Sequence, residues 1–221
     1  MAGMLMFQSH HDRILKSSFR GNAGLGINSV RSTNTLVRGN IMSRNDGEGF
    51  LLEGGEGLRV GHNRLVRNGG GITLGPGSDN VITRNRVFGG SEGIRIEKGH
   101  GNLVAHNLVA HTRGPGIRLG IRHPSVGGAH NSVRRNRVRD SGGDGFLVGR
   151  KERHSLLKLN VARRAKGDGF HIDSRSTTLT RNRAVDNGDP GIDAVFSVID
   201  GGGNRAHGNG DPRQCVNIVC N

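Results

Sequence analysis

A glycine followed by an apolar residue recurs along the whole chain at intervals of about 22 residues. The pairs are Gly3-Met4, Gly26-Ile27, Gly49-Phe50, Gly71-Ile72, Gly93-Ile94, Gly116-Ile117, Gly145-Phe146, Gly169-Phe170 and Gly191-Ile192. An independent series of asparagines follows the same interval: Asn40, Asn63, Asn85, Asn107, Asn136, Asn160, Asn182 and Asn204. Both series lengthen once, in the repeat that contains residues 121–128. This shared register predicts a solenoid in which each repeat forms one coil.

Each repeat is too short for a helix plus a strand, and it lacks the i, i+3, i+4, i+7 apolar spacing of a helix. Apolar residues instead lie three before and two after each asparagine, as Val104 and Val109 do around Asn107. These positions are expected to stack inward, and the asparagine side chains to form a buried amide ladder. Phe50, Phe146 and Phe170 are expected in the same core. The sequence predicts an all-β, single-stranded right-handed parallel β-helix of about nine coils over residues 1–221.

The two ends of the chain carry separate expectations. Residues 4–7 already read as a glycine-strand segment with no cap before them, so we expect a fragment or a start codon inside a longer protein. Met1–Phe7 lacks the charged start of a signal peptide, and no apolar run reaches the roughly 18 residues of a membrane span. Residues 208–221 form a C-terminal tail in which Cys215 and Cys220 are expected to pair. A disulfide needs an oxidising compartment, so we expect a secreted or periplasmic protein.

The repeat pattern, Asn-x-apolar-x-x-Asn and then Gly-[Ile/Phe]-x-apolar, resembles that of pectate-lyase-like and other carbohydrate-binding or sugar-hydrolase β-helix proteins. It also resembles that of periplasmic NosD-like proteins. The resemblance covers essentially the whole chain and implies the fold, whereas one scaffold hosts many activities. The catalytic signatures of two such families fail here. Gly99-His100-Gly101 lacks the paired aspartates of polygalacturonases, and Asp189-Pro190 continues with Gly191 rather than the histidine of mannuronan epimerases.

The charge of the chain points to a polyanionic partner. Net charge is +14, from 32 basic and 18 acidic residues. Basic residues flank the ladder asparagines, and equivalent positions in successive coils lie about 4.8 Å apart. The expected substrate-binding residues are Arg64, Arg86, Arg135, Arg137 and Arg183 beside these asparagines, together with Arg95 on the glycine-strand face. Arginine suits bidentate binding of carboxylate, phosphate or sulfate. Alternatively, these side chains stack on one another and stay solvated.

A second group of charged residues lies on the glycine-strand face. Arg118, His171 and Asp193 are outward residues and are the catalytic candidates. A polysaccharide lyase needs a base and a cation that neutralises the uronate carboxylate. The carboxylates of Asp144, Asp168 and Asp173 are a candidate calcium site. Two alternatives stay open, since aspartate before glycine is ordinary turn chemistry and His171 beside Asp193 could be a simple salt bridge.

Three functions are therefore weighed. The first is an extracellular protein that binds an acidic polysaccharide of the uronate type, with or without cleaving or epimerising it, and with calcium as the one candidate cofactor. The second is a non-catalytic structural, surface or periplasmic accessory solenoid of a longer protein. The third is nucleic-acid binding, which the absence of Trp and Tyr disfavours because bases stack on aromatic side chains. A metal site at His130 and His154 lacks a third ligand. Whether the protein is an enzyme, and its oligomeric state, are left open by the sequence.

Overall fold

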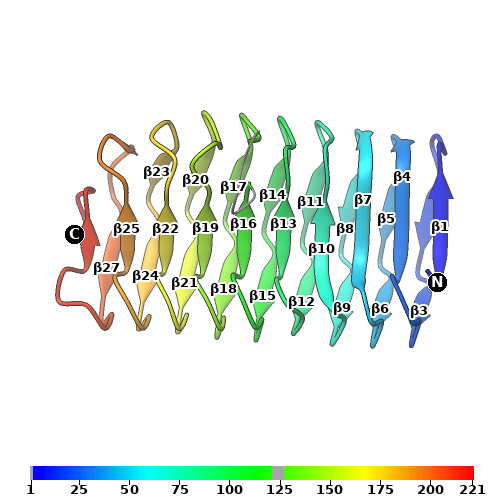
Figure 1. The fold of residues 1–221 in the computed structure, drawn as a ribbon, viewed down its shortest axis with the longest axis horizontal. Coiled ribbons are helices and arrows are strands. Elements are labelled where there is room, and N and C mark those ends of the chain that lie inside the picture. The colour runs from blue at the N-terminus through cyan, green and yellow to red at the C-terminus, as the bar shows by residue number, and fades with distance from the viewer. Residues whose placement is uncertain (1, 121–126) are drawn as a thin grey trace.

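The computed structural model describes residues 2–120 and 127–221, and in these residues the chain winds into a parallel β-helix with three sheets (Figure 1). The first sheet contains ten strands: β1 (Met4–Phe7), β4 (Ile27–Thr33), β7 (Glu48–Glu56), β10 (Gly70–Leu74), β13 (Ile94–Ile96), β16 (Ile117–Leu119), β19 (Phe146–Val148), β22 (Phe170–Ile172), β25 (Ile192–Ala194) and β28 (Cys215–Val216). The predicted all-β solenoid is confirmed.

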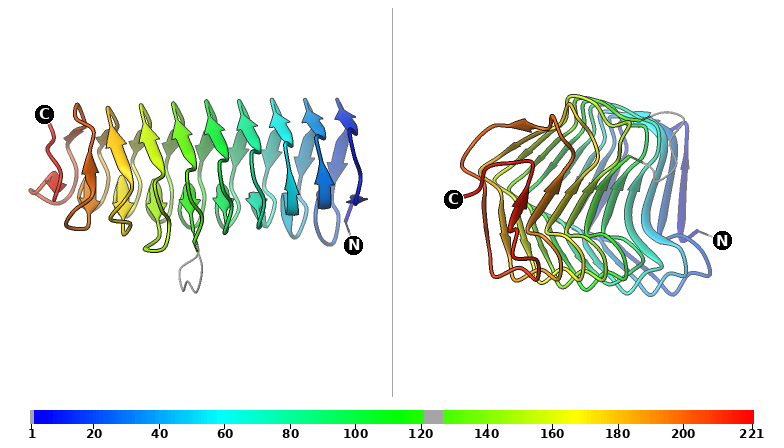
Figure 2. Two further views of the ribbon diagram at one scale, coloured as in Figure 1. Left: turned by 90° about the horizontal axis from the view of Figure 1, so that it is seen from above. Right: turned by 60° about the vertical axis from the view of Figure 1, so that its left-hand side comes forward.

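The other two sheets contain nine strands each, one from each coil (Figure 2). The second sheet is formed by β2 (Arg13–Leu15), β5 (Leu36–Arg38), β8 (Arg59–Gly61), β11 (Val81–Thr83), β14 (Leu103–Ala105), β17 (Ser132–Arg134), β20 (Leu156–Lys158), β23 (Thr178–Thr180) and β26 (Ile199–Asp200). The third is formed by β3 (Ser18–Arg20), β6 (Ile41–Ser43), β9 (Arg64–Val66), β12 (Arg86–Phe88), β15 (Leu108–Ala110), β18 (Arg137–Arg139), β21 (Val161–Arg163), β24 (Arg183–Val185) and β27 (Arg205–His207). The described residues form no helix that could cross a membrane.

The core is a column of apolar side chains that stack from coil to coil. Val104 and Val109, on either side of Asn107, are both fully buried, and their equivalents around the ladder asparagines from Asn40 to Asn182 are buried as well. Phe146 and Phe170 pair across β19 and β22 with their ring centroids 4.6 Å apart. The predicted inward positions are therefore confirmed, and this narrow core explains why a chain with only 32% apolar residues can fold.

The asparagine series forms a continuous buried ladder at the corner between the second and third sheets. The side chain of Asn136 shows the pattern: its Nδ2 donates to the carbonyl of Val104 at 2.9 Å and to Oδ1 of Asn160 at 3.1 Å. Its Oδ1 accepts hydrogen bonds from the backbone N–H and the Nδ2 of Asn107, at 2.9 and 3.0 Å. Each amide thus satisfies the corner backbone of the neighbouring coils, which buried peptide groups require.

The other two corners carry shorter ladders, one of which is formed by the second asparagine of the Asn-x-apolar-x-x-Asn pattern. Asn45 and Asn68 stack at the corner between the third and first sheets, and Asn187 and Asn209 do so near the C-terminus. Asn80, Asn102 and Asn131 stack between the first and second sheets. At the end of that ladder the buried carboxylate of Glu152 accepts from Nδ2 of Asn131 at 2.6 Å. In the C-terminal tail, Cys215 and Cys220 form a disulfide.

Candidate functional site

The corner between the second and third sheets is built by residues in the left-handed backbone region. The residue before the ladder asparagine has a φ between 53° and 58° in six successive coils, and these residues are His62, Arg84, His106, Arg135, Leu159 and Arg181. In this conformation the chain turns while the next residue, the asparagine, points inward. The residue after the asparagine begins the third sheet and points outward. Two rows of outward side chains therefore run side by side along the solenoid.

These two rows line an open groove with a volume of about 920 Å³. Its basic lining residues are His62, Arg64, Arg84, Arg86, His106, Arg135 and Arg137. The groove is floored by the ladder asparagines, and among the described residues that line it none is acidic. Two adjoining cavities extend the basic surface, one toward Arg134 and Lys158 on the second sheet and one toward Arg163 and Arg183 on the third.

The arginines of the groove have no acidic neighbours to neutralise them. Within the described part of the chain, Arg64, Arg86 and Arg137 form no ion pair with a carboxylate, and neither do Arg84 and Arg135. The pKa of His62 is lowered by partial burial and by the positive charges of Arg38 and Arg84. The groove is therefore a region of positive potential, and an anion placed in it meets no competing internal carboxylate.

Of the binding residues predicted from sequence, Arg64, Arg86, Arg135 and Arg137 lie together in this groove, and Arg183 lines the adjoining cavity. Arg95 lies elsewhere, on β13 in the first sheet. Its guanidinium contacts Glu97 at 3.2 Å and Glu48 at 3.4 Å, with Glu92 at 3.8 Å. Arg95 therefore lies on the first sheet, apart from the other five residues, and its charge is paired with carboxylates.

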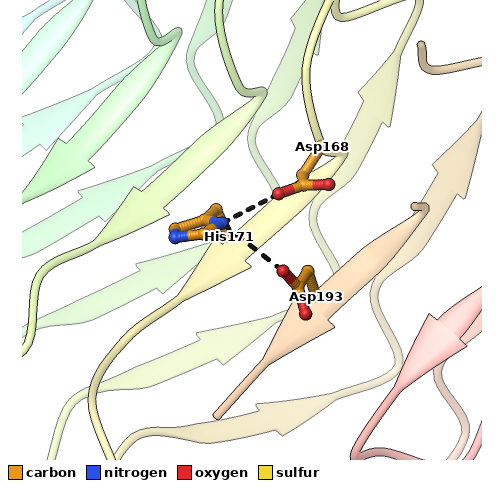
Figure 3. Close-up of side chains that lie close together, drawn as sticks. All are labelled: Asp168, His171 and Asp193. Atoms are coloured by element: carbon orange, nitrogen blue, oxygen red, sulfur yellow. Dashed lines mark hydrogen bonds and ion pairs between the residues drawn. The ribbon is translucent and has the colours of Figure 1, made fainter. Parts of the chain in front are cut away.

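The second candidate site lies on the outer face of the first sheet, around His171 of β22 (Figure 3). Nδ1 of His171 lies 2.8 Å from Oδ2 of Asp168 and 3.9 Å from Oδ2 of Asp193, on the neighbouring strand β25. Nε2 lies 3.5 Å from Oδ1 of Asp173. Asp144 belongs to the preceding coil and uses its Oδ1 to accept the backbone N–H of Asp168 at 3.0 Å. The structure thus gathers the predicted acidic residues around one imidazole.

This surrounding shifts the protonation equilibria of the cluster. The hydrogen bond to Asp168 is the largest cause that raises the pKa of His171 to about 9, and the charges of Asp173 and Asp144 add to it. Burial raises the pKa of Asp193, and the nearby charge of Asp168 raises it further. His171 is therefore a cation at neutral pH, held by a carboxylate, rather than a free base.

Replacing Asp168 with asparagine is expected to lower the pKa of His171 toward its ordinary value, since the main stabiliser of the imidazolium is lost. Titration of the His171 ring by NMR measures this directly. Because the folded-state pKa is raised, this interaction stabilises the fold below the unfolded pKa of about 6.5, and the stabilisation is lost as pH rises through about 9. An unchanged titration in Asp168→Asn would contradict the assignment, and Asp46→Asn, an exposed aspartate far from His171 in the sequence, serves as the control.

Arg118, the third catalytic candidate, lies two coils away from His171. It sits on β16, and Leu147 of β19 lies between the two in the register of the first sheet. Its guanidinium contacts Glu92 at 2.9 Å and Glu97 at 3.6 Å. The structure therefore brings His171 and Asp193 together but not Arg118. Asp168 is the partner of His171 that the sequence reasoning assigned to a turn or a metal instead.

One group of side chains could hold a metal ion among residues 2–120 and 127–221. Ligand atoms of Asp168, His171 and Asp193 all lie within 4.8 Å of one another. The predicted calcium ligands Asp144 and Asp173 lie beside this group but are not part of it. The group offers one imidazole nitrogen and carboxylate oxygens, a set that suits hard or borderline divalent ions. Soft thiolates are not available in it, because both cysteines form the disulfide.

Several solved β-helix structures resemble this fold. The periplasmic alginate epimerase AlgG T265N T268M double mutant superposes with a TM-score of 0.74 at 16% identity, covering 94% of this chain and 50% of that chain. DFA-IIIase from Arthrobacter chlorophenolicus A6 superposes with a TM-score of 0.58 at 14% identity, covering 90% of this chain and 53% of that chain. The chain thus spans about half the length of these structures, and at such identities the likeness shows the fold alone. None of the curated proteins matches the chain by sequence.

A family model matches the chain at residues 1–109 and again at 77–209. The description of this family names copper as a bound metal. The side chains described above do not fit a copper site. Copper(I) favours thiolate and thioether ligands, and copper(II) favours several imidazoles. The cluster at His171 supplies a single imidazole, and Met6 and Met42 are buried in the core. The matched residues nevertheless cover most of the sequence, and the chain belongs to the family described as periplasmic copper-binding protein (NosD).

Proposed function

We propose that this protein binds an acidic polysaccharide of the uronate type along the groove between the second and third sheets. The observation that carries the proposal is the row of exposed arginines that line the groove without any acidic partner. Like charges that stack about 4.8 Å apart repel one another, and a polyanion lying along the axis removes that repulsion. Arginine also binds carboxylates in a bidentate manner.

Two further observations support an acidic glycan. Trp and Tyr are absent from the chain, and the described residues that line the groove include no Phe, so the groove offers no phenyl or indole platform on which a neutral sugar could stack. The alginate epimerase that shares the fold is named for an acidic polysaccharide, and this likeness supports the proposal only by analogy. The family is described as periplasmic, and with the disulfide this supports a periplasmic or secreted location, where such glycans are accessible.

The test is a titration of the protein with fluorescently labelled oligogalacturonate, followed by anisotropy at increasing salt concentrations. We expect binding at low salt. The logarithm of the association constant should fall linearly with the logarithm of the salt concentration, because counterions are released when charges pair. A neutral oligosaccharide of the same length is the control and is expected not to bind. Absence of binding to any acidic glycan at low salt would rule out the proposal and favour a non-catalytic accessory or structural solenoid.

A catalytic role is the second candidate, favoured by the 2.8 Å contact between His171 and Asp168. The imidazolium could neutralise a uronate carboxylate or donate a proton to a leaving oxygen, while Asp193 lies close enough to act as the partner acid or base. Arg118 would have to act on a sugar bound two coils further along. A base role for His171 in lyase or epimerase chemistry would require loss of its proton first.

Turnover is tested by incubating the protein with alginate and with polygalacturonate, and following the absorbance of an unsaturated product with and without added calcium. A lyase would give new absorbance that His171→Ala abolishes. An increase on adding calcium would support a cation site in the acidic cluster around His171. Binding without turnover in every condition would rule out this lyase reaction and leave the groove as a docking surface; epimerisation is tested separately by NMR of the recovered polymer.

A further inference from the structure

From β12 to β24 the basic surface is not uniform along its length but carries two arginines in every second coil. The tripeptide Arg-Asn-Arg occurs at residues 84–86, 135–137 and 181–183. In each the asparagine is the buried ladder residue and both arginines are exposed. Each tripeptide therefore forms a clamp of two guanidinium groups that flank one point of the corner.

In the coils between the clamps the residue after the ladder asparagine is aliphatic, whereas the residue before it is His106 in one coil and Leu159 in the other. Along the third sheet Arg86 pairs with Leu108, and Leu108 pairs with Arg137. Arg137 in turn pairs with Val161, which pairs with Arg183. Leu108 and Val161 are half-buried, and they line the same cavities as the arginines on either side. From Arg86 to Arg183 the row thus alternates a cationic and an aliphatic position from coil to coil. It ends at each side in a further arginine, because Arg64 pairs with Arg86 and Arg205 pairs with Arg183.

The clamps repeat at twice the spacing of the coils, roughly 9.6 Å. A disaccharide in an extended, equatorially linked polysaccharide advances by a similar distance. We infer that the groove selects a polysaccharide in which an acidic sugar alternates with a neutral one. Each acidic group lies in one clamp, and each neutral ring lies over Leu108 or Val161. This inference rests on the proposed function and names the class of polymer that the same groove takes.

The chemistry of the two kinds of position explains why alternation is favoured. Two arginines can satisfy both oxygens of one carboxylate, which is the strongest arrangement of charge-assisted hydrogen bonds. Leu108 and Val161 offer apolar contact to the C–H face of a sugar ring, and that contact removes apolar surface from water. A polymer with an acid on every sugar would place each second carboxylate over an aliphatic side chain. There it would lose solvation without gaining a counter-charge.

The experiment compares two hexasaccharides: one of hyaluronan, which alternates glucuronate with a neutral N-acetylated sugar, and hexagalacturonate, which carries an acid on every ring. Affinities are measured by anisotropy at one fixed salt concentration. We expect the hyaluronan hexasaccharide to bind about tenfold more tightly although it has half the charge, whereas unselective electrostatics favours the more highly charged hexagalacturonate. Three clamps span about two double-coil spacings, so affinity is expected to rise with length up to the hexasaccharide.

A double variant tests the alternation itself. Leu108→Arg with Val161→Arg fills both gaps in the row and is expected to reverse the preference in favour of hexagalacturonate. Leu36→Arg with Val81→Arg is the matched control, because these half-buried positions belong to the second sheet, outside the cavities that carry the clamps. The control is expected to keep the wild-type preference, and circular dichroism checks that both variants fold.

The outcomes separate the inference from the proposal beneath it. If the wild type binds hexagalacturonate as tightly as the hyaluronan hexasaccharide or more tightly, the alternation is wrong while acidic-glycan binding stands. If neither hexasaccharide binds, the proposed function fails and the inference fails with it. If a single-stranded oligonucleotide binds more tightly than both, the surface is a nucleic-acid interface and both statements are overturned.

Discussion

Replacing Asn136 with leucine is expected to lower the free energy of unfolding by about 4 kcal/mol, because several buried hydrogen-bonding groups lose their partner at once. The carbonyl of Val104 and Oδ1 of Asn160 lose a donor, and the backbone N–H and the Nδ2 of Asn107 lose their acceptor. Leucine is similar in size, so the loss reflects the missing hydrogen bonds more than a cavity. Urea unfolding followed by circular dichroism measures the change.

The matched control is Asn22→Leu, at the first position of another ladder. Asn22 is only half-buried, and its side chain makes one hydrogen bond to the described residues, to Oδ1 of Asn45 at 2.7 Å. Its replacement is expected to cost at most about 1 kcal/mol. Hydrogen exchange adds a local readout, since the amide of Asn107 should lose protection only in the Asn136 variant. Equal unfolding midpoints for the two variants would contradict the role assigned to the ladder.

Replacing the four arginines of the first two clamps, Arg84, Arg86, Arg135 and Arg137, with glutamine is expected to weaken binding of acidic oligosaccharides about a hundredfold or more. Each lost charge-assisted pair is worth on the order of 1 kcal/mol, and the four replacements act on one ligand. The slope of affinity against salt should also become shallower, because fewer counterions are released. These side chains are exposed, so the fold should persist.

The control for this variant removes the same charge from other faces of the solenoid. Arg44, Arg150, Arg153 and Arg175 are exposed and lie outside the groove. Their replacement with glutamine lowers the net charge by the same amount and is expected to weaken binding only a few-fold, through the loss of long-range attraction. An equal loss in both variants would show that overall charge, rather than the groove, governs binding.

The fold could be predicted from the sequence because the same pattern of residues recurs in successive coils. Each coil contains the same inward apolar positions and one ladder asparagine, so neighbouring coils reinforce the same register. The ladders at the other two corners were not predicted as ladders, although the second asparagine of the repeat pattern belongs to one of them. There the amide is replaced in some coils, for example by Thr112 and Ser141, and short polar side chains can serve the same corner. Because the asparagine is missing from these coils, the pattern alone did not predict a continuous ladder there.

The contacts of the site residues were harder to predict. The register of the coils shows which residues lie on neighbouring strands, but it does not show which side chains touch. Counting coils correctly placed Asp193 beside His171, yet the imidazole turns toward Asp168, three residues before it in the same coil. Arg95 was grouped with the other arginines by residue type, whereas three glutamates lie around its guanidinium. Both outcomes depend on side-chain orientation, which periodicity alone does not encode.

The most direct test of the account is a crystal structure of the protein bound to a uronate-containing hexasaccharide. We predict that the sugar chain lies parallel to the solenoid axis in the groove between the second and third sheets. Its carboxylates should lie within hydrogen-bond distance of Arg84, Arg86, Arg135 and Arg137. A hexasaccharide bound instead on the outer face of the first sheet, across Arg118 and His171, would contradict the central claim and make the charged cluster the functional site.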